Sequence, residues 1–99
     1  MLLCSLLSCA EKAVQLYTSL AVVDGNPAIS YHKDVSESLM YIRASDAIGS
    51  AWDMPQAIDS PIVGEAGAYS SLAVINGNPA ISYYFSDLPD TSLRFIRYW

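Results

Sequence analysis

The chain of 99 residues contains few of the residues that build disulfide frameworks, metal sites or nucleic-acid interfaces. Its two cysteines, Cys4 and Cys9, both lie in the first ten residues, so no disulfide framework spreads through the fold. A zinc site needs more His and Cys ligands than the chain supplies. The single histidine, His32, follows a predicted strand and precedes Lys33-Asp34, and we expect it in a solvated loop. The chain is acidic, and its five Lys and Arg are scattered, which excludes the dense basic stripe of a nucleic-acid binder.

The chain also lacks long hydrophobic runs. No stretch reaches the ~20 apolar residues of a membrane span. The N-terminal "MLLCSLLSCAEKA" is apolar but short, and no Lys or Arg precedes Lys12, so it is not a convincing signal peptide. Within it "LLSC", Leu6 to Cys9, has some similarity to a lipoprotein cleavage site, but the segment ahead of it is too short and uncharged. We therefore predict that residues 1–16 form a separate segment, either helical or disordered.

No catalytic constellation is visible in the sequence. Most acidic residues fall in predicted turns, where solvated carboxylates are expected. The segment Ser86 to Ser92 could offer oxygen ligands to Ca²⁺, but it lacks the dense acidic spacing of a calcium loop. Ser19, Ser70 and Ser71 have no suitably placed histidine for a nucleophilic triad. Nothing near Cys4 would activate its thiol. The sequence therefore predicts no enzyme, cofactor or metal.

What the chain does contain is an internal repeat. The stretch "DGNPAISY", Asp24 to Tyr31, returns as "NGNPAISY", Asn76 to Tyr83. From Tyr17 to Tyr31, twelve of fifteen positions are identical to those 52 residues later. Further on, "SLMYIR" (residues 38–43) matches "SLRFIR" (residues 92–97) at an offset of 54. The two additional residues between the matched blocks belong in a loop.

Each part of the repeat favours a β-strand or a tight turn. The β-branched and apolar runs 17–23, 28–32 and 38–45 are typical of strands, and 54–61 is a plausible short fourth strand. Neither face of these strands is strongly polar, which indicates a sheet buried on both faces. Pro27 and Pro79 fall at a strand edge, where a missing N–H is tolerated. Each repeat contains a candidate tight turn whose first two residues tolerate φ > 0, followed by an asparagine. The candidate turn residues are Asp24, Gly25 and Asn26 in the first repeat, and Asn76, Gly77 and Asn78 in the second.

Four antiparallel strands in a meander of about 52 residues are the signature of a β-propeller blade. We predict an all-β fold of antiparallel β-propeller blades, about two in number with the second incomplete. The first repeat covers residues 17–68, and the second covers residues 69–99 and is truncated after its third strand.

The pattern "SLAVVDGNPAISYH…LMYIRASDAIGSAW…AIDS" resembles the tandem repeats of large bacterial propeller-like proteins, which are similar in style to sialidase-type β-propellers. The resemblance covers about Tyr17 to Trp99. Within it "SDAIGSAW" is similar to the sialidase Asp-box, a turn between the third and fourth strands of a blade. Asp46, Gly49 and Trp52 match its Asp, Gly and Trp, whereas Ala44 and Ala51 replace its Ser and Thr, and one additional residue precedes Gly49.

The resemblance implies structural roles for these residues. Asp46 would accept hydrogen bonds from backbone N–H groups of the turn, and Gly49 would adopt a conformation closed to other residues. Trp52 would pack between blades. The arginine motif and the Tyr and Glu pair of sialidases have no counterpart in the chain, and Arg43, Arg94 and Arg97 do not form that motif.

The predicted function is a non-enzymatic β-propeller repeat module that acts as a scaffold or as a binding surface for an unknown protein or carbohydrate. The alternative is a truncated sialidase-like glycoside hydrolase fragment without its catalytic residues.

Three arrangements fit the repeat: a piece of a longer propeller, a small protein that self-associates into a ring of blades, or a stand-alone meander of about seven strands. The compartment is open, with an extracytoplasmic or cell-surface location implied by the resemblance alone. The aromatic residues Tyr31, Tyr83, Tyr84, Trp52 and Trp99 are expected to pack between blades or to line a binding surface.

Overall fold

The computed structural model describes residues 15–97. All regular structure in this part of the chain is β, as the sequence predicts. The seven strands are β1 (Gln15–Val23), β2 (Asn26–Lys33), β3 (Ser38–Arg43), β4 (Gln56–Asp59), β5 (Glu65–Ile75), β6 (Asn78–Asp87) and β7 (Asp90–Arg97). Residues 15–97 contain no helix long and apolar enough to cross a membrane. Cys4, Cys9, Trp99 and most of the predicted N-terminal segment lie outside the described residues.

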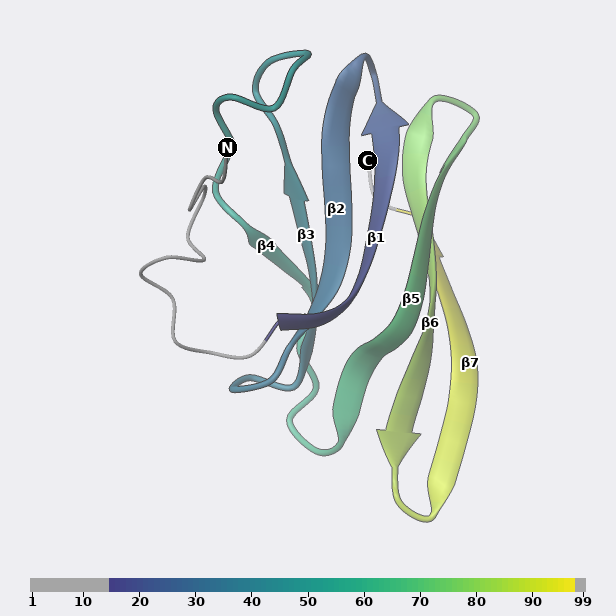
Figure 1. Cartoon of the computed structure of the whole chain (residues 1–99). Helices are drawn as coiled ribbons and strands as arrows, with labels where there is room; N and C mark the ends of the chain where they lie inside the picture. The colour runs from purple at the N-terminus through teal and green to yellow at the C-terminus, as the bar shows by residue number, and fades with distance from the viewer. Residues whose placement is uncertain (1–14, 98–99) are drawn as a thin grey trace.

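The strands form two antiparallel sheets, β1-β2-β3-β4 and β5-β6-β7, each in chain order. We call them the first sheet and the second sheet. They face each other, with β5 packed against β1, β2 and β3 (Figure 1). The seven strands are therefore two stacked layers and do not form a single continuous meander. The surface of each sheet that faces the other is called its inner face, and the opposite surface its outer face.

Both sheets begin with the same hairpin. Asp24 and Gly25 have φ values of 50° and 85°, and Asn76 and Gly77 have 53° and 81°. Two consecutive positive φ values between paired antiparallel strands define a type I′ turn, whose twist matches that of the strands. No atom lies within 4 Å of a Cβ built on either glycine, so the backbone angle and not the available space requires glycine here.

The first strand of each sheet extends beyond the repeated sequence and contains a bulge. β1 begins at Gln15, so the last two residues of the predicted N-terminal segment belong to the sheet. The strand register shifts between Leu16 and Ser19. Tyr17 lies within this bulge at φ 56°, and its counterpart Tyr69 has φ 55° in the bulge of β5. Positive φ is rare for a bulky residue, and its presence at both positions makes the bulge a feature of the repeat.

The main hydrophobic core lies between the two inner faces. Leu39 and Tyr41 of β3 pack there with residues of the second sheet, among them Leu72, Ile81 and Tyr83. On the outer face of the first sheet a second cluster contains Tyr31, Met40 and Ile42, with Ile29 and Trp52 packed against it. The first sheet is therefore apolar on both faces. The sequence predicts this, because neither face of its strands is strongly polar.

Gly67 allows the two sheets to approach closely. Its φ is 101°, and a Cβ built on it would lie 2.8 Å from Cα of Leu39. The backbone of β5 thus passes directly over β3 at this point, and any side chain would force the layers apart. Gly67 lies outside the aligned part of the repeat, so the repeat gives no signal for this close approach.

A polar network also joins the sheets, at the β4 edge. The hydroxyl of Tyr83 donates to Oδ2 of Asp59 at 2.7 Å, and Nη1 of Arg94 lies 3.2 Å from the same oxygen. The guanidinium of Arg94 also stacks 3.7 Å from the ring centroid of Phe85. Burial, and then the hydrogen bond to Asp59, raise the pKa of Tyr83 to about 12.

Candidate functional site

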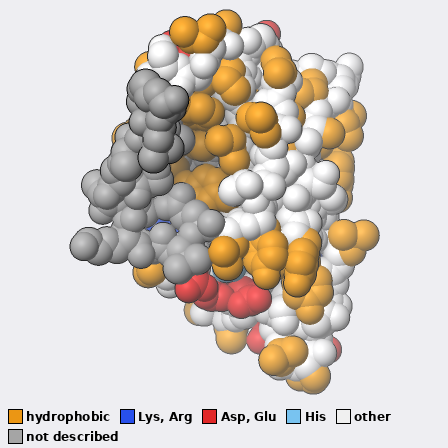
Figure 2. All heavy atoms as spheres, in the orientation of Figure 1, with side chains coloured by type: hydrophobic (Ala, Val, Ile, Leu, Met, Phe, Trp, Pro, Cys, Tyr) orange, Lys and Arg blue, Asp and Glu red, His pale blue; other side chains and the backbone are white. Residues whose placement is uncertain are grey.

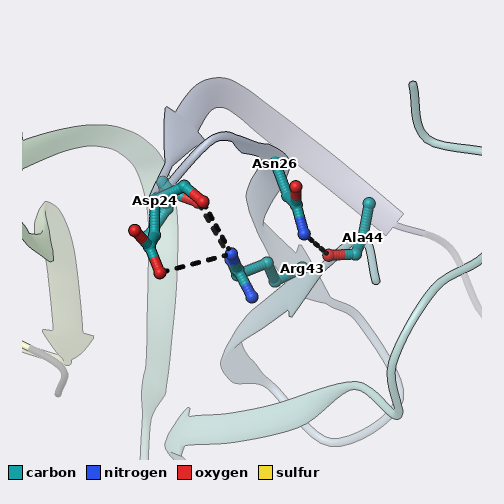
Figure 3. Close-up of polar contacts among 5 residues, drawn as sticks. Asp24, Asn26, Arg43 and Ala44 are labelled. Carbon is teal, nitrogen blue, oxygen red and sulfur yellow. Dashed lines mark hydrogen bonds and ion pairs between the residues drawn. The ribbon is translucent and has the colours of Figure 1, made fainter. Parts of the chain in front are cut away.

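The first β-hairpin is tied to the end of β3 by two side chains (Figure 3). The amide of Asn26 donates to the carbonyl oxygen of Ala44 at 3.1 Å. The guanidinium of Arg43 donates to the backbone oxygens of Val23 and Asp24 at 3.0 and 3.1 Å, and lies 4.0 Å from the Asp24 carboxylate. The turn is therefore capped by a cation and is held to the sheet independently of the strand ladder.

A cavity of about 440 Å³ lies where the two type I′ turns meet. Asp24 and Arg43 line it from the first sheet, and Gly77 and Asn78 line it from the second. The structure thus brings turn residues predicted from both repeats to a single place, with Asp53, Met54 and Tyr41 among the other lining residues. Both charges and apolar surface are present, which suits a small polar ligand better than a purely apolar one.

The Asp-box-like residues form a separate turn between β3 and β4. Oδ1 of Asp46 accepts from the backbone N–H of Ser50 at 2.9 Å, and Oδ2 accepts from the Ser50 hydroxyl. These bonds lower the pKa of Asp46, and the bond from the Ser50 hydroxyl has the largest effect. Gly49 has φ 77°, and its carbonyl oxygen accepts from Nε1 of Trp52 at 2.9 Å. The turn is closed by its own side chains, and the Trp52 ring packs on the outer face of the first sheet.

His32 does not lie in a solvated loop, and that prediction was wrong. It belongs to β2, faces the second sheet, and is only 4% exposed. Its Nδ1 lies 2.7 Å from the carbonyl oxygen of Ala66 in β5. The error arose because the strand continues through Lys33, so that its alternation turns His32 inward.

Acidic side chains gather near His32, in the turn between β2 and β3 and at the start of β5. One ligand atom from each of His32, Asp34 and Glu37 lies within 4.8 Å of the other two. A hydrogen bond to the Glu65 carboxyl, together with burial and nearby negative charge, raises the pKa of Glu37. Glu37 and Glu65 also line a cavity of about 420 Å³ with Asp87.

Aromatic rings from equivalent positions of the two repeats pack against each other, in a tilted arrangement, beside this cluster. The ring centroids of Tyr17 and Tyr69 are 4.5 Å apart. Tyr17 also meets His32 edge-on at 6.3 Å, and Tyr69 meets Tyr84 in the same way at 6.1 Å. A hydrogen bond with Tyr69 is the main cause that raises the pKa of Tyr17. The paired bulges place these rings, and the sequence signal that could have found them is the repeat itself.

The other candidates from the sequence are dispersed. Ser86 to Ser92 form a tight hairpin in which Asp87 pairs with Asp90. The Ser30 and Ser70 hydroxyls hydrogen-bond each other across the sheets at 2.9 Å, and Ser19 Oγ accepts from the N–H of Leu72 at 3.0 Å. These serines therefore join the two layers.

Comparison of the chain with protein families, with curated proteins and with solved structures finds no match.

Proposed function

We propose that the chain is a non-enzymatic repeat module of the β-propeller type, which acts as a scaffold by stacking its sheets on those of a second copy. The observation that carries this proposal is that equivalent residues of the two repeats differ sharply in burial. The first sheet has a neighbour on its inner face, whereas the equivalent face of the second sheet has none among the described residues.

The clearest cases lie on the third strands. Leu39 is 0% exposed and Tyr41 is 5% exposed, because both point from β3 into the core. Their counterparts in β7, Leu93 and Phe95, are 82% and 61% exposed. Ile96 points into the core, so strand alternation places Leu93 and Phe95 on the outer face. The outer face of the second sheet therefore repeats the residues that the first sheet uses to bind a neighbouring sheet.

A complementary surface is present on the same chain. Leu20 and Val22 of β1 are exposed on the outer face of the first sheet. Their counterparts in β5 are Leu72 and Val74, and Leu72 is buried in the core between the sheets. The outer face of β1 in one copy could therefore pack on the second sheet of another. Such a contact joins two different surfaces, so it builds either a closed ring or an open stack.

The experiment is a measurement of mass in solution by light scattering over a range of protein concentrations. We expect the wild type to be larger than a monomer, and Leu93→Asp and Phe95→Asp to reduce the mass toward that of a monomer. Leu88→Asp is the matched control, because Leu88 is equally exposed but lies in the β6–β7 turn. A wild type that stays monomeric at all concentrations, or a control that dissociates as fully as Phe95→Asp, would overturn the proposal.

A further inference from the structure

We propose that His32, Asp34 and Glu37 form a binding site for a divalent first-row transition-metal ion such as Zn²⁺. The three residues come from the end of β2 and the turn that follows it, where the two sheets meet. One ligand atom from each lies within 4.8 Å of the other two. Figure 2 shows a group of acidic side chains in the lower left part of this face of the molecule. This site is separate from the stacking surfaces of the proposed function and does not depend on them.

The histidine is held in the state that a metal ligand requires. The carbonyl oxygen of Ala66 can only accept a hydrogen bond, so Nδ1 of His32 donates across the 2.7 Å contact. Nε2 then carries the lone pair in the neutral ring. Metal-binding histidines usually donate their second ring N–H to a carbonyl or carboxylate in this way. Only 4% of the His32 surface is exposed, so the surrounding packing fixes the orientation of the ring.

The same residue of β5 also positions the turn that carries Glu37. The backbone N–H of Ala66 donates to the carbonyl oxygen of Glu37 at 3.0 Å. The N–H of Glu37 in turn donates to the carbonyl oxygen of Asp34 at 3.3 Å. Glu37 adopts φ 54°, which ends the turn with a left-handed residue. Both backbone groups of Ala66 are thus committed to the site, one to the imidazole and one to the turn. The second sheet thereby fixes the imidazole of His32 and the backbone of Glu37 before an ion arrives.

The local charge favours a cation. Glu37 lines the adjoining cavity together with the carboxylates Glu65 and Asp87. Several carboxylates held together at neutral pH repel one another, and a bound divalent ion would offset that repulsion. Glu65 is placed to orient Glu37 from outside the ligand set.

The donor set selects the class of metal. An imidazole nitrogen with two carboxylates suits Zn²⁺ or Mn²⁺, whereas Ca²⁺ prefers oxygen ligands alone. Ligand atoms around tetrahedral Zn²⁺ lie about 3.4 Å apart at the usual bond lengths. The exposed Asp34 and half-buried Glu37 can close the remaining gap by rotation of their side chains. The repeat equivalent of His32 is Tyr84, so each chain would hold one such ion.

The test is calorimetric titration of the full chain with ZnCl₂ at pH 7. The titration uses a Cys4→Ser, Cys9→Ser background, so that thiolates cannot bind the metal. We expect one ion per chain, a higher melting temperature with Zn²⁺, and at least a tenfold loss of affinity in Asp34→Asn and in Glu37→Gln. Asp90→Asn serves as the matched control, since Asp90 is an exposed carboxylate at the start of β7, outside the cluster. His32→Gln should also lose affinity, with circular dichroism to show that it folds.

Two results would overturn the proposal. One is the absence of a saturable Zn²⁺ isotherm, or an isotherm that Asp34→Asn and Glu37→Gln leave unchanged. The other is Ca²⁺ binding as tight as Zn²⁺ binding and unaffected by His32→Gln in a folded variant, which would indicate an acidic patch without a histidine ligand. Because Asp34 is exposed, Asp34→Asn is expected to fold, and it keeps the test decisive if His32→Gln does not.

Discussion

The side-chain amide of Asn26 donates to the carbonyl oxygen of Ala44, in the place where the next residue of the strand lacks a donor. Ala28 pairs with Arg43, so residues 27 and 44 lie opposite each other across the β2–β3 ladder. The N–H of Ala44 donates to the Pro27 oxygen at 2.8 Å. A regular ladder would return a bond from the N–H of residue 27, which proline does not have. Asn26 supplies that missing bond, and this gives the sequence Asn-Pro a physical reason.

Asn26→Ala should therefore destabilise the fold. The variant leaves the fully buried Ala44 carbonyl without this donor, and we expect a loss of about 1–3 kcal/mol in the free energy of unfolding. Urea denaturation monitored by Trp fluorescence measures it. Adding Pro27→Ala restores a backbone N–H at the correct place, so the double variant should lose less than the sum of the two single variants. If the losses of the two single variants simply add in the double variant, the Asn26 amide does not replace the N–H that is missing at residue 27.

Two glycines with positive φ should differ in their tolerance of alanine. Gly25→Ala meets open space and should cost about 1 kcal/mol, through the backbone angle alone. Gly67→Ala meets the Leu39 backbone at 2.8 Å and should cost about 1–3 kcal/mol more, because the sheets must separate. Thermal and urea unfolding of the two variants give the comparison. Equal losses would show that the close approach of β5 to β3 is not needed for stability.

The sequence could predict those parts of the fold that depend on local chemistry. Asp24-Gly25 and Asn76-Gly77 specify their hairpins through backbone conformation, and the matched runs that follow specify the strands. The same reasoning could not place His32, because a single apolar-to-polar boundary does not fix where a strand ends. The stacking of the two sheets depends on contacts between residues far apart in sequence, such as Gly67 over Leu39. No local pattern encodes that approach.

The candidate site was missed for the same reason. His32, Asp34 and Glu37 are close in sequence, but the group that aligns them is the backbone of Ala66, 34 residues after His32. Read locally, an isolated histidine followed by acids is typical of a solvated turn. Only the second sheet, by burying the imidazole and bonding its Nδ1, makes the three residues a candidate ligand set.

Glu37→Gln should have opposite effects on stability with and without metal. The raised pKa of Glu37 means that its protonated form is favoured in the folded state. Its stabilising contribution is therefore present at low pH and is lost as the pH rises through the folded pKa. At pH 7 without metal, the neutral amide removes repulsion with Glu65, so the variant should melt at a higher temperature than the wild type. With Zn²⁺ the order should reverse, because the wild type alone gains the ion.

Differential scanning fluorimetry at pH 4 and pH 7, with and without Zn²⁺, measures these differences. Glu11→Gln is a suitable control for net charge, since residue 11 belongs to neither repeat. If Glu37→Gln melts at the same temperature as the wild type in metal-free buffer at pH 7, the carboxyl pair carries no repulsion in the folded state.

The network of Tyr83, Asp59 and Arg94 should make the fold sensitive to alkali. The pKa of Tyr83 is raised to about 12, above the ordinary value of 10.0. Between these two values the unfolded chain releases the phenolic proton while the folded chain keeps it, so the free energy of unfolding falls as pH rises. Below pH 10 both states are protonated, and the hydroxyl continues to donate to Asp59. The loss is thus confined to the range from about pH 10 to 12.

Tyr83→Phe isolates this contribution. The variant loses the hydrogen bond to Asp59 and should be less stable at neutral pH by about 1.5–3 kcal/mol, since the acceptor is charged. Its stability should then fall less steeply than that of the wild type between pH 10 and 12, because it has no phenol at this site to ionise. Urea denaturation at closely spaced pH values gives both slopes. Parallel slopes for Tyr83→Phe and the wild type would show that the phenol titrates alike in the folded and unfolded chains.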